Sequence, residues 1–106
     1  MSSLYRFEYI VDSRHAWLKV RADLLDRLGI ASQISNCSRV SHAERWIYLD
    51  KTTDAPTFDR ALRALLGLTE AQYLEWMRER TQLKTPAKAS LRNYDRYTTT
   101  TEGITK

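Results

Sequence analysis

The sequence predicts an α+β domain: a small antiparallel sheet of about four strands packed with three helices, in the order ββαββαα, plus an extended C-terminal segment. Three observations predict it. The N-terminal half alternates apolar and polar side chains, as strands with one buried side do. The second half carries apolar residues at helical spacing. A length of 106 residues, 42% of them apolar, fits one core and leaves no room for a second.

Strands are predicted from alternation and from β-branched and aromatic content. Residues 5–11 form the first strand, 12–15 a turn and 16–20 the second strand, with Ala16, Leu18 and Val20 inward. A weak edge strand at 33–40 precedes a strand at 46–49, and these two are expected to pair. The inward residues of the first strand are expected to be Tyr5, Phe7, Tyr9 and Val11.

Helices are predicted from apolar stripes and their end signals. Residues 21–28 form a short helix that Gly29 ends, with Ile30 contacting Leu25. Asp54 caps the second helix, which ends at Gly67. A capping box at 69–72 opens the third helix, which is expected to reach about Gln82. The second helix has a complete apolar stripe: Phe58, Ala61, Leu62, Leu65 and Leu66.

The positive charge is concentrated in the C-terminal segment. Residues 1–82, predicted to be the single α+β domain, carry a net charge of +1, and residues 83–106 carry +3. This basic tail begins with a linker at 84–90 and ends in a polar stretch at 98–106, so we expect only part of it to be ordered. Residues 91–97 alternate enough to add an extended segment to the sheet. A short basic tail is typical of a solubility element with weak attraction to polyanions.

No residue pattern indicates catalysis, a cofactor or a metal. Cys37 with His15 or His42 would be a thiol–imidazole pair only if the fold brought them together, and a small, half-buried Cys37 is the simpler interpretation. One Cys and two separate His show no metal-ligand spacing. Nor is there a Gly-rich phosphate loop or a nucleophile elbow. We therefore expect a non-enzymatic protein with neither cofactor nor metal.

The sequence also predicts a compartment. No apolar run approaches the roughly 18 residues that a membrane helix needs. The first residues lack the apolar core of a secretory signal, and a lone Cys37 agrees with a reducing compartment. We expect a cytoplasmic protein that contacts no membrane.

Residues 62–80 could form a helix-turn-helix, with Gly67 at the turn. Arg63 stands where that motif needs a small side chain, and Glu70, Glu75 and Glu79 would face the phosphates. An ordinary helical hairpin is the favoured interpretation.

The candidate partner-binding residues are aromatic residues and arginines that we expect to be exposed. Interleaved arginines and tyrosines suit single-stranded nucleic acid, and they equally suit a protein interface, where both are enriched. Packing of the tyrosines on the sheet is a third interpretation, and the sequence does not separate the three. The candidates are Tyr73 or Trp76 on the third helix and Arg92, Tyr94, Arg96 and Tyr97 in the tail.

Residues 92–97 read Arg-x-Tyr-x-x-Tyr, and the segments 15–20, 28–30 and 47–49 supply core and turn residues ahead of it. With these features the chain resembles, over residues 5–62 and 91–97, a family of small uncharacterised proteins encoded by phages, plasmids and other mobile elements. The family's closing Arg-x-Tyr-x-x-aromatic segment is similar to residues 92–97. Cys37 and Arg39 depart from the family pattern, as does 51–53, which replaces a more acidic stretch. The other matching residues are 15–20, Leu24, Leu25, 28–30, Ile34, Ser35, Ser38, 47–49, Asp54, Ala55, Phe58 and Ala61.

The resemblance, together with the lack of a catalytic set, favours a protein that inhibits a host defence by occupying a host protein surface. An anti-CRISPR protein that binds a CRISPR-Cas component is the leading case. The alternative is a small nucleic-acid-binding accessory or transcriptional regulator that uses the basic tail. The chain is expected to be a monomer or a weak homodimer, and the sequence does not decide whether two copies pair through the weak strand around residues 36–38.

Overall fold

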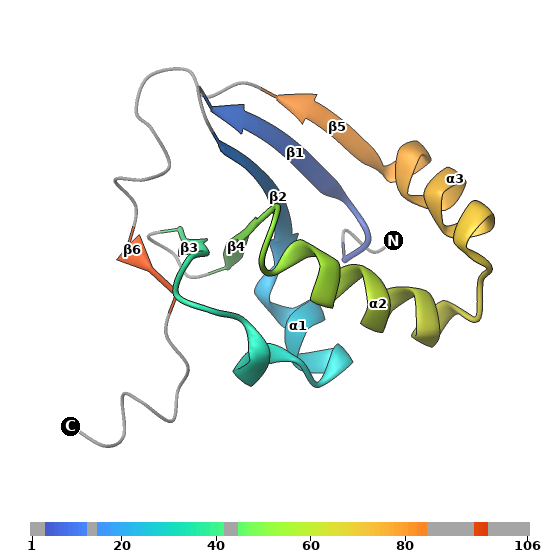
Figure 1. Ribbon diagram of the computed structural model, residues 1–106, viewed down its shortest axis with the longest axis horizontal. Coiled ribbons are helices and arrows are strands. Elements are labelled where there is room, and N and C mark those ends of the chain that lie inside the picture. The colour runs from blue at the N-terminus through green and yellow to red at the C-terminus, as the bar shows by residue number, and fades with distance from the viewer. Residues whose placement is uncertain (1–3, 13–14, 42–44, 85–94, 98–106) are drawn as a thin grey trace.

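The computed structural model describes residues 4–12, 15–41, 45–84 and 95–97. These residues form one sheet in the strand order β5-β1-β2-β4-β3-β6, together with three α-helices (Figure 1). The predicted α+β class is confirmed, with six strands where about four were expected. The strands are β1 Phe7–Asp12, β2 His15–Arg21, β3 Arg39–Val40, β4 Trp46–Asp50, β5 Thr81–Lys84 and β6 Asp95–Arg96. The helices are α1 Ala22–Leu28, the 3₁₀ helix η1 Ala31–Gln33, α2 Ala55–Leu66 and α3 Glu70–Arg80.

Four antiparallel strands form the centre of the sheet, and their register sets which side chains share a face. Leu18 on β2 lies opposite Tyr9 on β1 and opposite Leu49 on β4. Val20 lies opposite Ile47. Because partners in register point to the same side, these residues form one apolar face.

All three α-helices contribute to the core on that face. Leu24 and Leu25 of α1 are 0% and 1% exposed, and Phe58 and Leu62 of α2 are both 0% exposed. Tyr73 of α3 belongs to the same cluster. The buried strand residues that meet these helices are Phe7, Leu18, Val20, Ile47 and Leu49.

The predicted inward set is wrong at Val11 and Leu65. Val11 is 44% exposed and Leu65 is 53% exposed, whereas Ile10, predicted to point outward, is only 7% exposed. Both faces of the sheet carry an apolar cluster. Ile10 belongs to the cluster on the face away from the helices, and it is buried there. A strand buried on both sides does not follow a simple two-residue alternation.

The helix ends follow the prediction closely. Gly29 has φ 73°, and the N–H of Ile30 donates to Leu25 O at 3.1 Å. Gly67 ends α2 in the same left-handed conformation. The capping box of α3 is also present, with Thr69 Oγ1 accepting from Gln72 N at 3.2 Å.

The third helix is shorter than predicted, because its last residues form a strand. α3 ends at Arg80, and β5 runs parallel to β1 from there (Figure 1). In the register of the pair, Phe7 lies opposite Thr81 and Glu8 opposite Gln82. Residue 82, where the domain was expected to end, therefore lies inside β5.

The predicted strand at 33–40 is wrong except at Arg39–Val40, because Asp54 binds this segment by its side chain. Asp54 is 2% exposed, and its carboxylate accepts hydrogen bonds from Ser35 N at 3.0 Å and Ser35 Oγ at 2.8 Å. Ser38 Oγ donates to the same carboxylate and accepts from Asp50 N at 2.8 Å. Asp54 stands at the N-cap of α2, as predicted, but its carboxylate makes no hydrogen bond to the N-terminus of the helix, so the expected side-chain cap is wrong.

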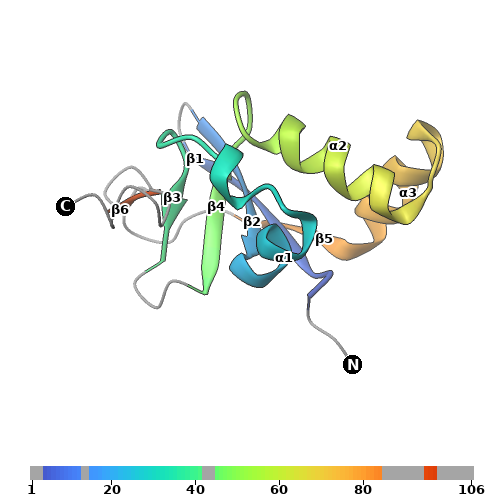
Figure 2. The same cartoon turned by 90° about the horizontal axis from the view of Figure 1, so that it is seen from below.

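The C-terminal segment adds the edge strand β6 next to β3. Residues 91–97 were expected to add an extended segment to the sheet, and residues 95–97, which the structure describes, do so. Arg96 lies opposite Arg39 in the β3–β6 pair, and Tyr97 N donates to Ser38 O at 2.9 Å. This part of the chain therefore occupies the strand edge that a second copy would need in order to pair there. Figure 2 shows β6 and β3 together at the end of the sheet away from α3.

Candidate functional site

The two candidate anchors on α3 pack into the protein. Tyr73 is 5% exposed, and its hydroxyl donates to Asp59 Oδ1 at 2.6 Å. Trp76 is half-buried, with its ring centroid 5.5 Å from that of Tyr5 and 6.2 Å from that of Phe7. The expectation that Tyr73 is exposed is wrong, because α3 turns this residue toward α2.

Tyr73→Phe is expected to lower the free energy of unfolding by about 1–2 kcal/mol at pH 7. Burial raises the pKa of Asp59, while the Tyr73 hydroxyl and the charge of Lys51 hold that rise back. A carboxyl whose folded pKa exceeds its unfolded value favours folding at low pH and loses that contribution as pH rises through the folded pKa. Removing the hydroxyl raises this pKa further, so the loss should shrink below about pH 4. Urea unfolding of the wild type and of Tyr73→Phe, at pH 7 and below about pH 4, measures the loss in free energy of unfolding. An equal loss at the two pH values would contradict this reasoning.

Of the four tail candidates, Tyr97 and Arg96 lie within the described residues and the other two lie outside them. Tyr97 is 9% exposed, and its hydroxyl donates to Ala31 O at 2.7 Å, so the expectation of an exposed ring is wrong. Arg96 lies on β6, paired by its backbone with β3. Arg92 and Tyr94 lie outside the described residues. Of the six candidates, the described structure brings only Tyr73 and Trp76 together, with ring centroids 6.3 Å apart.

The weaker candidates gain no support from the geometry. Cys37 is exposed rather than half-buried, and the ring of His15 stacks on Trp17 at 5.5 Å. His42 lies outside the described residues. Among the residues the structure describes, no three His, Cys, Asp or Glu side chains gather as metal ligands. The α2–α3 hairpin continues directly into β5, and Arg63 Nε donates to Leu68 O across its turn.

A group of aromatic and basic side chains lies on the sheet face opposite the helices. Ile10, Trp17 and Tyr48 form its buried cluster, with Trp46 packed against them. No residue of a described helix belongs to this cluster. We call this side of the sheet the second face and define it by Ile10, Trp17, Lys19, Arg21, Trp46 and Tyr48.

Two basic side chains meet on the indole of Trp46. Lys19 Nζ lies 4.6 Å from the ring centroid, and Arg21 Cζ lies 5.5 Å from it. Lys19 also lies 5.8 Å from the centroid of the Tyr48 ring and 3.6 Å from Glu8 Oε1. Cations this close to an aromatic face are attracted by its quadrupole, so the ring and the charges hold one another in place.

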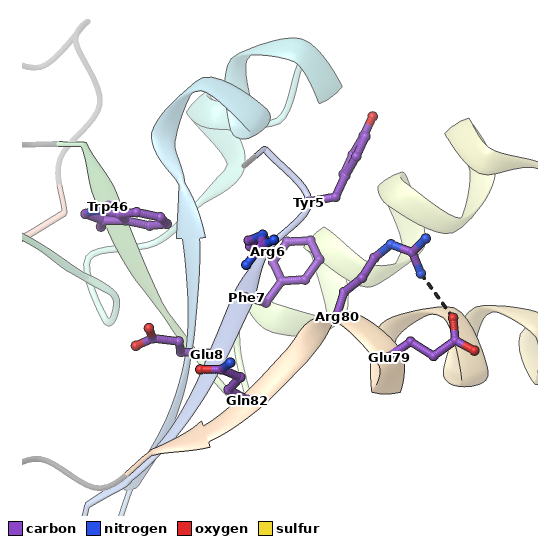
Figure 3. Close-up of a pocket in the computed structure, with 8 residues that line it drawn as sticks. All are labelled: Tyr5, Arg6, Phe7, Glu8, Trp46, Glu79, Arg80 and Gln82. Atoms are coloured by element: carbon purple, nitrogen blue, oxygen red, sulfur yellow. Dashed lines mark hydrogen bonds and ion pairs between the residues drawn. The ribbon is translucent and has the colours of Figure 1, made fainter. Parts of the chain in front are cut away.

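A hollow of about 770 Å³ lies at the end of the second face where β1 and β5 begin. Figure 3 shows Glu8 and Gln82 side by side on neighbouring strands, with Trp46 reaching in from β4. The remaining lining comes from the start of β1 and the junction of α3 with β5. The full lining is Tyr5, Arg6, Phe7, Glu8, Trp46, Glu79, Arg80 and Gln82.

The second face was missed from the sequence, although its signal is present there. In β2 the residues between Ala16, Leu18 and Val20 are Trp17 and Lys19, and Arg21 continues the series. In β4, Trp46 and Tyr48 alternate with Ile47 and Leu49 in the same way. Alternation that places tryptophan and basic residues together on the outward side predicts a binding surface rather than a merely solvated one.

Within the described residues, no helix is both long enough and apolar enough to cross a membrane. A scan of protein-family models finds no matching family, and searches of curated proteins and of solved structures find no match either.

Proposed function

We propose that this chain is a non-enzymatic binding protein from a phage or other mobile element that inhibits a host defence by occupying a host protein surface. An anti-CRISPR activity against a CRISPR-Cas component in the host cytoplasm is the leading case. The observation that carries the proposal is the gathering of Lys19 and Arg21 on the Trp46 ring. Tryptophan and arginine dominate binding energy at protein interfaces.

The second face also favours a particular chemistry in the partner. Lys19 and Arg21 have side chains that are 20% and 29% exposed, so their charged ends lie at the boundary of the surface. Their carboxylate neighbours are Glu8 and Asp23, which balance part of the charge. An acidic patch on the partner would complement the charged ends of Lys19 and Arg21.

The proposed inhibition has a direct test in cells. A host that restricts a phage by CRISPR-Cas is made to express this chain, and phage plating is compared with that on the same host carrying an empty vector. The proposal expects plating to be restored. Unchanged restriction, with the chain expressed and folded, would contradict the anti-CRISPR activity.

Capture from the host lysate tests whether inhibition proceeds by protein contact. The tagged chain is used as bait with and without nuclease, at low and at physiological salt. We expect a defence component to be recovered with and without nuclease at both salt concentrations. Recovery should fall only modestly at physiological salt, because salt screens Lys19 and Arg21 but leaves the contact of the Trp46 ring intact. Recovery that is lost with nuclease and falls steeply with salt would instead favour the nucleic-acid-binding accessory.

A further inference from the structure

We propose that the hollow at the end of the second face binds one nucleotide of a single-stranded nucleic acid. This inference goes beyond the proposed function, which requires no ligand in the hollow. Its volume of about 770 Å³ lies within the range of small-ligand pockets, about 300–1,000 Å³. Its lining combines an aromatic ring, hydrogen-bonding side chains and an exposed arginine, which are the three groups that a nucleotide needs.

Trp46 supplies the aromatic surface for the base. It is half-buried on β4, and Lys19 and Arg21 hold its position from neighbouring β2. A base stacks on an aromatic side chain whatever its identity, because every base has a π-face. Trp46 therefore gives affinity without strong sequence preference.

Glu8 and Gln82 supply groups for the edge of the base. They lie opposite each other in the β1–β5 register, and Figure 3 shows their side chains next to each other. The amide of Gln82 can donate and accept hydrogen bonds, and the carboxylate of Glu8 accepts them. Lys19 lies 3.6 Å from Glu8 and balances its charge, so the carboxylate does not act as an isolated anion beside a phosphate.

Arg6 supplies the charge for the phosphate. It is exposed, lies directly before β1 and lines the hollow together with Glu8. The other arginine of the lining, Arg80, already donates to Trp76 O at 3.1 Å and lies over the Trp76 ring at 4.3 Å. A guanidinium binds a phosphate through paired hydrogen bonds, so Arg6 is the residue expected to do so.

The site selects single strands over duplexes. Stacking on Trp46 needs a free base face, and contact with Glu8 and Gln82 needs a free base edge. A duplex hides the face by stacking and the edge by pairing. Simple attraction between phosphates and basic residues would show no such preference.

Fluorescence anisotropy with a labelled oligo-dT of about ten nucleotides tests the proposal on the purified full chain. We expect salt-dependent binding that a duplex of the same length does not match. Trp46→Ala should weaken binding about tenfold or more, while Trp46→Phe keeps most of it. Arg6→Gln should weaken binding and reduce the slope of log affinity against log salt by about 0.7, the loss of one phosphate contact. Arg60→Gln, which removes an exposed charge from α2, is the matched control and should leave both unchanged.

Several results would overturn the proposal. These are no binding at about 50 mM salt, equal binding of duplex and single strand, or wild-type binding by both Trp46→Ala and Arg6→Gln. Thermal unfolding of each variant shows that it is folded, and exposed Arg6 can be replaced without disturbing the core. Arg6→Gln should leave nuclease-resistant capture and phage plating intact, so failure of the nucleotide site is distinguishable from failure of the proposed function.

Discussion

Replacement of Asp54 by alanine is expected to lower the free energy of unfolding by about 3 kcal/mol or more. The carboxylate is 2% exposed and accepts hydrogen bonds from Ser35 N, Ser35 Oγ and Ser38 Oγ. Its removal leaves the buried Ser38 hydroxyl and two part-buried donors of Ser35 without this acceptor, and a buried unsatisfied donor costs about 1–3 kcal/mol. Chemical denaturation followed by circular dichroism measures the loss.

Two further variants test the reason for this loss. Asp26→Ala removes an exposed aspartate from α1 and should change the free energy of unfolding by less than about 0.5 kcal/mol. Asp54→Asn keeps the shape and one acceptor oxygen, so it should cost less than Asp54→Ala. An Asp54→Ala protein as stable as the wild type would show that Asp54 does not hold the 35–38 segment in place.

Trp17→Ala is expected to lower the free energy of unfolding by about 3–5 kcal/mol. Trp17 is 1% exposed at the centre of the second face, stacked with His15 and 5.9 Å from Arg39 Cζ. Its removal leaves a cavity between Ile10 and Tyr48, the two residues that share its cluster.

Trp17→Phe should cost less than about 2 kcal/mol, because most of the ring remains. Among the residues that the structure describes, none is a hydrogen-bond partner of the indole Nε1 of Trp17, so phenylalanine loses no such bond to them. Thermal and urea unfolding of both variants measure the difference. Equal losses would mean that the Nε1 group, rather than the bulk of the ring, stabilises this face.

Much of the fold could be predicted because local chemistry determines it. Left-handed Gly29 and Gly67 end their helices, and the Thr69 capping box opens α3, as their sequence contexts predict. Alternation in β2 correctly placed Leu18 and Val20 in the core. These features depend on neighbours within a few residues.

The errors arise where a distant part of the chain determines the local structure. Asp54 binds Ser35 and Ser38, and this contact replaces both the predicted strand and the predicted side-chain cap. β5 exists because residues 81–84 meet β1 at the other end of the sequence, a parallel pairing that no local pattern shows. The hollow has the same origin, since it depends on Glu8 meeting Gln82.

The candidate site was less predictable than the fold because aromatic content alone does not distinguish anchors from core. Tyr73 and Tyr97 each donate a hydroxyl hydrogen bond inside the protein, to Asp59 and to the backbone of Ala31. Buried tyrosines need such partners, so an arginine-rich neighbourhood does not make a tyrosine an exposed anchor. Trp46 differs because its neighbours are the cations Lys19 and Arg21.

The central claim, that Trp46, Lys19 and Arg21 of the second face form the contact surface, is tested most directly by two charge-matched double variants. Lys19→Gln with Arg21→Gln removes two charges from this face, and Arg27→Gln with Arg60→Gln removes two from exposed positions on α1 and α2. Both are compared with the wild type for phage plating on the CRISPR-Cas host and for nuclease-resistant capture. We expect the first pair to lose both activities and the second pair to keep them. Retention of both activities by the first pair, or their loss in the second, would contradict the claim.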